Sequence, residues 1–97
     1  MSKPEKRLQD RCIAYLKDQK IYTFNVYGSG RSGKGAPDLI TCINGQFVAF
    51  ELKVGDNDMQ DDQIIHKIRI ERNGGRHYCP YSFEEFVAIV EGLQHDN

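Results

Sequence analysis

The dipeptide Asn44-Gly45 constrains the fold of this chain more than any other local feature. It stands between two apolar runs, "DLITCI" (38–43) and "QFVAFELK" (46–53). Asn-Gly in such a setting is typical of a two-residue β-hairpin, because a type I′ turn requires a positive φ at both central positions. We therefore predict two antiparallel strands over 38–43 and 46–53.

A two-residue turn also fixes which side chains face each other across the hairpin. Its register sets Ile40 opposite Ala49 and, continued outward, Asp38 opposite Glu51. Opposed side chains lie on the same face, with Cβ atoms about 4.5–5.5 Å apart. Lys53, two residues beyond Glu51, points to that face as well. Two carboxylates and one ammonium group are therefore predicted to meet at one end of the hairpin.

The pair Asp38 and Glu51 brings two negative charges together. Like charges placed directly opposite each other destabilise a hairpin unless something positive lies between them. A divalent cation fits, since Mg²⁺ is commonly bound through one or two carboxylates with water and phosphate oxygens. Lys53 could hold a phosphate or assist an attacking water. The structural alternative is that these are ordinary charged residues at strand ends, with Lys53 neutralising Glu51; the glycine-rich, basic segment leading into Asp38 favours the metal site.

Capping boxes and apolar stripes predict helices on both sides of the hairpin. Ser2 and Glu5 form an S-x-x-E capping box for a helix over 3–19, and Ser82 and Glu85 form one for a final helix. The remaining predicted elements are a strand over 21–27, a helix over about 58–73 with an apolar stripe of Ile64, Ile65 and Ile68, and a short strand over 76–81.

The predicted order, α-β-β-β-α-β-α, defines the fold class. A helix that crosses over between the third and fourth strands requires those strands to be parallel, whereas the hairpin is antiparallel. We therefore predict an α/β fold with a mixed central sheet flanked by helices, formed as a single domain over 1–97.

Composition limits the possible partners and surroundings. The formal net charge is −1, so any contact with nucleic acid would depend on local basic patches or on metal ions. Three cysteines without a C-x-x-C spacing favour reduced thiols over a disulfide framework or a zinc site. No signal peptide or membrane span is recognisable, so we expect a cytoplasmic protein without a membrane partner.

The segment "GSGRSGKGAPD" (28–38) resembles two phosphate-binding patterns. Its letters fit G-x-G-x-x-G and G-x-x-x-x-G-K, except that Gly35 stands where the second pattern requires Ser or Thr. Both patterns need a helix directly after the glycines, whereas a proline and an apolar strand follow here. A nucleotide-binding module built on Gly28–Gly35 is therefore the weaker alternative, and no nucleotide cofactor is expected.

The sequence also resembles a known nuclease signature. Pro37-Asp38, the hairpin and then "ELK" (51–53) are similar to the PD-(D/E)xK motif, and the element order is similar to the restriction-endonuclease-like αβββαβ core with an extra C-terminal helix. In detail the chain resembles the VRR-NUC domain family in its minimal stand-alone form. The matching features are Glu5, "GAPDLI", "FELK", Gln63 and Gly74-Gly75, which extend over nearly the whole chain.

The resemblance implies an endonuclease that hydrolyses DNA with Mg²⁺ or Mn²⁺. Asp38 and Glu51 would be metal ligands and catalytic residues, with the backbone carbonyl of Leu52 as a further ligand. Lys53 would orient or deprotonate the attacking water and stabilise charge that develops on the phosphate.

Glu5 and Gln63 are supporting site residues on the strength of the resemblance, Glu5 as a possible metal ligand and Gln63 as a catalytic residue. Glu5 has an alternative role in the capping box, although it shares a helical face with Gln9 and so can look toward the sheet. Gln63 lies about 100° around its helix from Ile64; Gln60 is a competing candidate, and plain solvent exposure is the structural alternative.

Basic residues of the first helix and of the glycine-rich segment are expected to contact DNA phosphates, which position a duplex without reading its sequence. We expect structure-selective cutting of branched DNA, such as a Holliday junction, by a homodimer, because stand-alone family members resemble Holliday-junction resolvases. A non-catalytic DNA-binding or assembly module on the same fold is the other alternative, and the intact acidic pair and lysine argue against it. The expected DNA contacts are Arg7, Arg11, Arg31 and Lys34.

Overall fold

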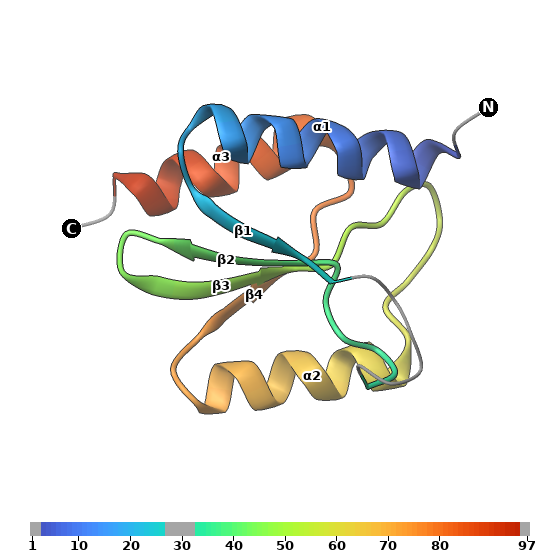
Figure 1. The fold of residues 1–97 in the computed structure, drawn as a ribbon. Coiled ribbons are helices and arrows are strands. Elements are labelled where there is room, and N and C mark those ends of the chain that lie inside the picture. Colours follow the sequence, from blue (N-terminus) through green and yellow to red (C-terminus); the bar gives the residue numbers. More distant parts are fainter. Residues whose placement is uncertain (1–2, 27–32, 96–97) are drawn as a thin grey trace.

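The computed structural model describes residues 3–26 and 33–95 and shows one sheet with helices on both of its faces (Figure 1). Helices α1 and α3 lie side by side on one face, and α2 lies on the other. The strands stand in the order β1-β2-β3-β4. The elements are α1 (Pro4–Asp18), β1 (Tyr22–Asn25), β2 (Leu39–Ile43), β3 (Gln46–Phe50), α2 (Asp61–Arg72), β4 (Arg76–Tyr78) and α3 (Phe83–Gln94).

The hairpin between β2 and β3 has the predicted turn and the predicted register. Asn44 and Gly45 have φ values of 51° and 79°, as a type I′ turn requires. Ile40 pairs with Ala49 across the antiparallel strands. β3 and β4 run parallel, as the crossover through α2 demands. The predicted mixed sheet and element order are therefore confirmed.

All four strands are shorter than predicted, β2 by one residue because it begins at Leu39. β1 covers Tyr22–Asn25 rather than 21–27, and residue 27 lies outside the described part of the chain. β3 ends at Phe50 and β4 at Tyr78. The chain beyond them still runs alongside, since the Lys53 N–H donates to the Pro80 carbonyl at 3.3 Å. Pro80 itself has no N–H to donate, so a regular ladder cannot continue through it.

The first helix begins differently from the prediction. Lys3 takes the N-cap position without a side-chain cap, and Pro4 opens the helix, where its fixed φ and missing N–H cost nothing. Glu5 therefore occupies the second helical position rather than the third position of the predicted capping box, and Ser2 lies outside the described residues. At α3 the predicted cap is present, because the Ser82 hydroxyl accepts from the Glu85 N–H at 3.1 Å.

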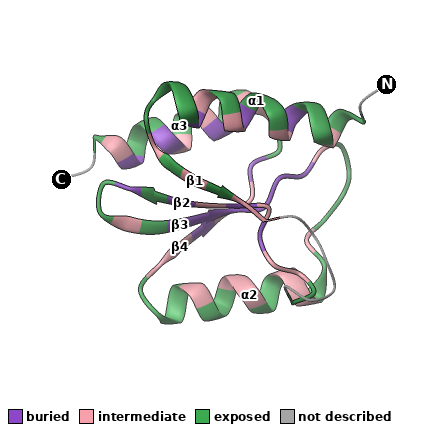
Figure 2. Ribbon diagram, viewed as in Figure 1, coloured by how far each residue is buried: buried purple, intermediate pink, exposed green. Residues whose placement is uncertain are grey.

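The hydrophobic core lies between the sheet and the pair α1 and α3 (Figure 2). Alternate residues of β2 and β3 point into it, which is the pattern of strands with one face on a core. This core fixes the hairpin, and the hairpin positions the candidate site at its open end. The main core residues are Leu8, Cys12, Leu16, Leu39, Val48, Phe50, Leu52, Phe86 and Val90.

Helix α2 does not bury the isoleucine stripe predicted for it. Ile64, Ile65 and Ile68 are 39%, 55% and 42% exposed. The helix is turned so that Lys67 faces β4, where its ammonium group donates to the His77 carbonyl at 3.2 Å. At about 100° per residue, Ile65 then lies about 160° around the helix from Lys67, on the outer side, whereas Ile64 and Ile68 lie on the flanks, about 60° and about 100° from it. The same rotation brings Gln63 over the end of the hairpin.

Candidate active site

The candidate site lies where the hairpin strands leave the sheet. Asp38 immediately precedes β2 and Glu51 immediately follows β3, so they form the next pair beyond Leu39 and Phe50. The Glu51 N–H donates to the Tyr78 carbonyl at 2.9 Å, which ties the end of β3 to β4. Both acidic residues are thus held by backbone that continues the sheet.

Short contacts connect the side chains that meet there. The Leu52 N–H donates to Asp38 Oδ2 at 2.8 Å. Lys53 Nζ lies 4.0 Å from Glu51 Oε2, and Gln63 Nε2 donates to the same oxygen at 3.1 Å. Asp38 and Glu51 also interact directly through their carboxyl groups. The structure therefore brings Asp38, Glu51, Lys53 and Gln63 together.

Burial makes the electrostatics of this cluster unusual. Glu51 is 2% exposed and Lys53 is 8% exposed. The pKa of Glu51 is raised to about 8. Desolvation is the largest cause, the charge of Asp38 and a hydrogen bond with it add to the shift, and the charge of Lys53 opposes it. Among the described residues, Glu51 Oε1 has no hydrogen-bond partner. Lys53 therefore offsets only part of the cost of a negative charge on Glu51 beside Asp38, and Glu51 Oε1 is left unpaired.

This donor set fits a hard divalent cation. Carboxylate oxygens are the ligands that Mg²⁺ and Mn²⁺ prefer, and a cation would offset both the repulsion with Asp38 and the unpaired oxygen of Glu51. Within residues 3–26 and 33–95, no group of three or more His, Cys, Asp and Glu side chains gathers at metal-binding distance. The protein would therefore supply a pair of carboxylates, and backbone, water and phosphate oxygens would complete the set.

Gln63, rather than Gln60, reaches the acidic pair. Gln60 is the N-cap residue of α2, and its N–H donates to Gln63 Oε1 at 2.7 Å. The Gln63 amide therefore accepts from the helix cap on one side and donates to Glu51 on the other. The Q-x-x-Q spacing is a capping signal in the sequence, but it does not reveal that the capping side chain also contacts the Glu51 carboxyl group.

Glu5 lies at the margin of the site. It is half-buried near the start of α1, and its charge is the smallest of the named influences that raise the pKa of Glu51. Sequence reasoning missed a further group beside the site, the Cys79 thiol, whose pKa is raised by burial and then by the Glu51 charge. The parallel pairing of β4 with β3 places the Cys79 thiol there, and the sequence does not specify which residues pair across these two strands.

The predicted DNA contacts differ in their surroundings. Lys34 has 92% of its side chain exposed, with its ammonium group 3.9 Å from an Asp62 oxygen. Arg7 is exposed on α1. Arg11 packs its guanidinium 4.1 Å above the Phe83 ring, so part of its charge is engaged in a cation–π contact. Arg31 lies outside the described residues.

Fold and site together define a class of protein. A mixed sheet with helices on both faces, and an acidic pair followed by a lysine at the end of its hairpin, is the restriction-endonuclease-like αβββαβ arrangement with an added C-terminal helix. The predicted fold class, an α/β fold with a mixed sheet flanked by helices, is therefore confirmed.

Two solved structures share this fold over nearly the whole chain. One, described as a VRR_NUC domain, matches with a TM-score of 0.78 and 19% identity, covering 99% of this chain and 100% of that chain. Another, a VRR_NUC domain protein, matches with a TM-score of 0.79 and 17% identity, covering 96% and 89%. The predicted resemblance to VRR-NUC domains is therefore confirmed at the level of the fold.

Sequence comparison alone gives no relative. No family model matches the chain, and no curated protein matches it. Among the described residues, no helix combines the length and apolar character needed to span a membrane.

Proposed function

We propose that this protein is a Mg²⁺- or Mn²⁺-dependent endodeoxyribonuclease of the VRR-NUC type, which acts as a homodimer on branched DNA. The observation that supports this most strongly is the convergence of Asp38, Glu51, Lys53 and Gln63 at the end of the hairpin. Two carboxylates can hold a divalent metal, which would polarise the phosphate and activate a water, and an ammonium group beside them can stabilise the charge that develops.

Asp38 and Glu51 would hold the metal, with the Leu52 carbonyl and Glu5 as further ligands. A bound Mg²⁺ or Mn²⁺ supplies Lewis acidity toward the phosphate and lowers the pKa of a water molecule. The chain itself fixes the ligand geometry: the Leu52 N–H orients the Asp38 carboxylate, and the Gln63 amide orients that of Glu51. Preorganised ligands of this kind need no rearrangement when the substrate arrives.

Lys53 has the position and the chemistry to act on the phosphate. Its stem is buried and its ammonium group lies beside Glu51, so it carries its charge in a site that excludes much of the solvent. There it can donate to a phosphate oxygen and stabilise the charge that grows as the water attacks. Interactions aimed at developing charge in such a setting are worth far more than they are in bulk water.

DNA binding would come from backbone contacts. Arg7 and Lys34 are exposed on elements that flank the site, and Arg11 and Arg31 are proposed to add to them. Contacts of basic side chains with phosphates position DNA without sequence information, which agrees with selection of a branched shape.

The test is cleavage of labelled DNA by the purified protein. A four-way junction, a flap, a single strand and a plain duplex are each incubated with Mg²⁺, with Mn²⁺ and with EDTA. We expect metal-dependent cutting, fastest on a branched substrate. Binding to junction DNA without any cutting would instead support the non-catalytic alternative.

A further inference from the structure

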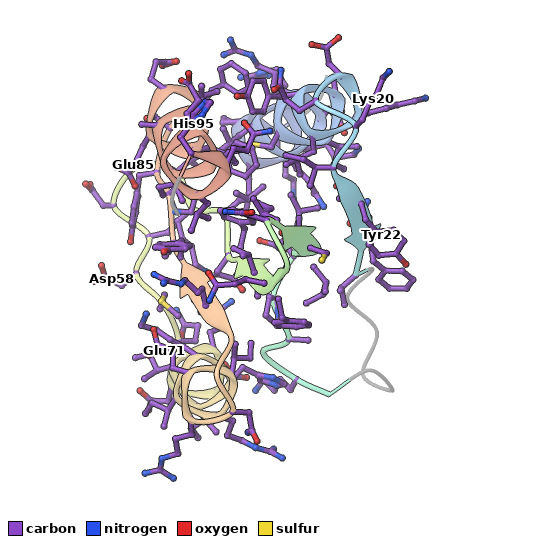
Figure 3. All side chains as sticks on the ribbon, turned by 90° about the vertical axis from the view of Figure 1, so that its left-hand side faces the viewer. Lys20, Tyr22, Asp58, Glu71, Glu85 and His95 are labelled. Carbon is purple, nitrogen blue, oxygen red and sulfur yellow. The ribbon has the colours of Figure 1, made fainter. Side chains whose placement is uncertain are left out.

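Helix α2 leaves part of its own face of the sheet uncovered. It contacts β4, and Figure 3 shows it under the β4 side of the sheet while Tyr22 projects from β1 at the opposite margin. We call the uncovered part the open sheet face. It lies along two rows of cross-strand neighbours, Tyr22–Cys42–Phe47 and Phe24–Ile40–Ala49, and it ends at Ala49, which is fully buried.

The open sheet face is apolar and accessible. Tyr22 is 68% exposed, Phe24 is 56% exposed and Phe47 is 46% exposed, and Cys42 is exposed as well. An aromatic side chain offers about 150–250 Å², so these three rings present roughly 300 Å² of apolar surface. The largest apolar patch on a typical monomer is about 300–600 Å² and is often functional, so this patch is a candidate interaction site.

The same face carries both a ridge and a groove. The ridge is the pair Tyr22 and Phe24 on β1. The groove, of about 520 Å³, runs between Phe47 and α2. Because β1 and β3 are separated by one strand, ridge and groove lie about 10 Å apart. The groove is lined by Phe47, His66, Arg69, Ile70, Asn73 and Gly75.

We propose that a second copy of this chain docks on the open sheet face about a two-fold axis close to Cys42. In a two-fold contact the same patch occurs on both sides and each residue pair occurs twice. The β1 ridge of each copy then enters the groove beside Phe47 of the other. Cys42 lies between ridge and groove in the first row, so the axis passes near it.

Charge favours a second copy over DNA at this face. Neither row contains Lys, Arg, Asp or Glu, so two copies meet without bringing like charges together, whereas a phosphate backbone would find no cation there. Arg69 stands at the rim of the groove. A roughly 300 Å² apolar centre within a polar rim matches an interface of about 800 Å² per partner.

The open sheet face also leads directly to the candidate site. Ile40 and Ala49 are paired in its second row, and Asp38 and Glu51 are two residues further along on the same face. Docking through this face therefore gives the dimer two sites related by the axis. The inference rests on the homodimer of the proposed function and adds the surface that forms it.

The outer side of α2 offers a matched control. Ile65 is 55% exposed, as much as Phe24, but lies on the side of α2 turned away from the sheet.

The molecular mass in solution is measured by sedimentation velocity without DNA and without metal, across a dilution series. We expect a dimer for the wild type and for Ile65→Asp. Phe24→Asp and Tyr22→Asp should each weaken association by about 100-fold or more, with unchanged circular dichroism.

Cross-linking tests the position of the axis in the unaltered fold. Mild oxidation or a short bis-maleimide should join two copies through Cys42, since a disulfide requires Cα atoms within about 7 Å. Cys42→Ser should abolish the linked species, whereas Cys79→Ser should keep it. Linkage that persists in Cys42→Ser would overturn the proposed axis even if the aspartate variants failed to fold.

The remaining outcomes separate this inference from the nuclease proposal. A wild type that stays monomeric, or a dimer lost in Ile65→Asp and kept in Phe24→Asp, contradicts docking on the open sheet face. A monomer whose binding to a single-stranded oligonucleotide falls in Tyr22→Ala also contradicts it, because the rings would then stack on bases. If the wild type dimerises and the variants change association as predicted, but no DNA is cut, the docking surface is supported and the nuclease proposal is contradicted.

Discussion

The burial of Glu51 suits the candidate site but lowers the stability of the metal-free protein. Its carboxyl group is buried, one of its oxygens lacks a partner among the described residues, and its pKa is raised to about 8. The ordinary value in an unfolded chain is 4.5. Between these two values the unfolded chain releases a proton that the folded, metal-free protein keeps, so stability falls as the pH rises from about 4.5 to about 8.

Glu51→Gln should therefore stabilise the metal-free protein at alkaline pH. The amide has the same shape and no charge, so the loss between about pH 4.5 and pH 8 disappears. We expect the melting temperature at about pH 9 to rise by about 4 °C or more, with little change at about pH 4. Thermal unfolding in EDTA across this range measures it.

Metal addition gives the complementary control. Mn²⁺ should raise the melting temperature of the wild type but not that of Glu51→Gln, because a ligand that binds only the native state stabilises it by mass action. Parallel pH profiles for the two proteins in EDTA would contradict the assigned burial of the Glu51 charge.

Lys53→Met tests the ammonium group apart from the packing of its stem. Methionine keeps most of the buried volume, so folding and thermal stabilisation by Mn²⁺ should persist while DNA cleavage falls about 100-fold or more. Lys17→Met, on the exposed surface of α1, is the matched control and should cut normally. Undiminished cleavage by Lys53→Met would remove Lys53 from the mechanism.

At the scale of elements, the segment that leads into Asp38 rests on the first turn of α2. Gly35 has a φ of +85°, and a Cβ there would lie 2.6 Å from the carbonyl carbon of Asp62. His66 Nε2 donates to the Lys34 carbonyl at 3.1 Å. The same turn of α2 carries Gln63, so the elements that bear the site are in direct contact.

Gly35→Ala should break this contact. The new methyl group meets backbone rather than a movable side chain, and the positive φ is unfavourable for alanine. We expect a loss of about 1–3 kcal/mol in the free energy of unfolding, measured by urea denaturation. Gly92→Ala is the control, because Gly92 is in α3 with nothing within 4 Å of an added Cβ, and alanine there should stabilise by about 0.5–1 kcal/mol.

Sequence reasoning succeeded where the determinants are local. Asn44-Gly45 specifies the turn, the turn specifies the register, and the register places Asp38 beside Glu51. The rotation of α2 about its own axis could not be predicted from local sequence in this way. Three isoleucines predicted a buried stripe, but all three are exposed, because Lys67 is the residue of α2 that faces β4. The place of Gln63 came from the family resemblance alone.

At the scale of the whole molecule, the chain is small relative to a DNA branch. Its principal extents are 36 × 34 × 23 Å, so a single copy spans about ten base pairs at about 3.4 Å each. A four-way junction presents two strands for cutting, and a two-fold dimer offers one site for each. Cuts placed symmetrically about the branch point are therefore the expected product of the dimer.

The central claim is that the cluster at the end of the hairpin hydrolyses DNA. The most direct measurement is the cleavage rate of a four-way junction, labelled on each strand in turn, by the wild type and by Asp38→Asn purified side by side. We predict symmetric cuts by the wild type in Mn²⁺ and none in EDTA. The cleavage rate of Asp38→Asn should be lower than that of the wild type by about 100-fold or more. Equal cutting by the two proteins, or none by the wild type in either metal, would contradict the account.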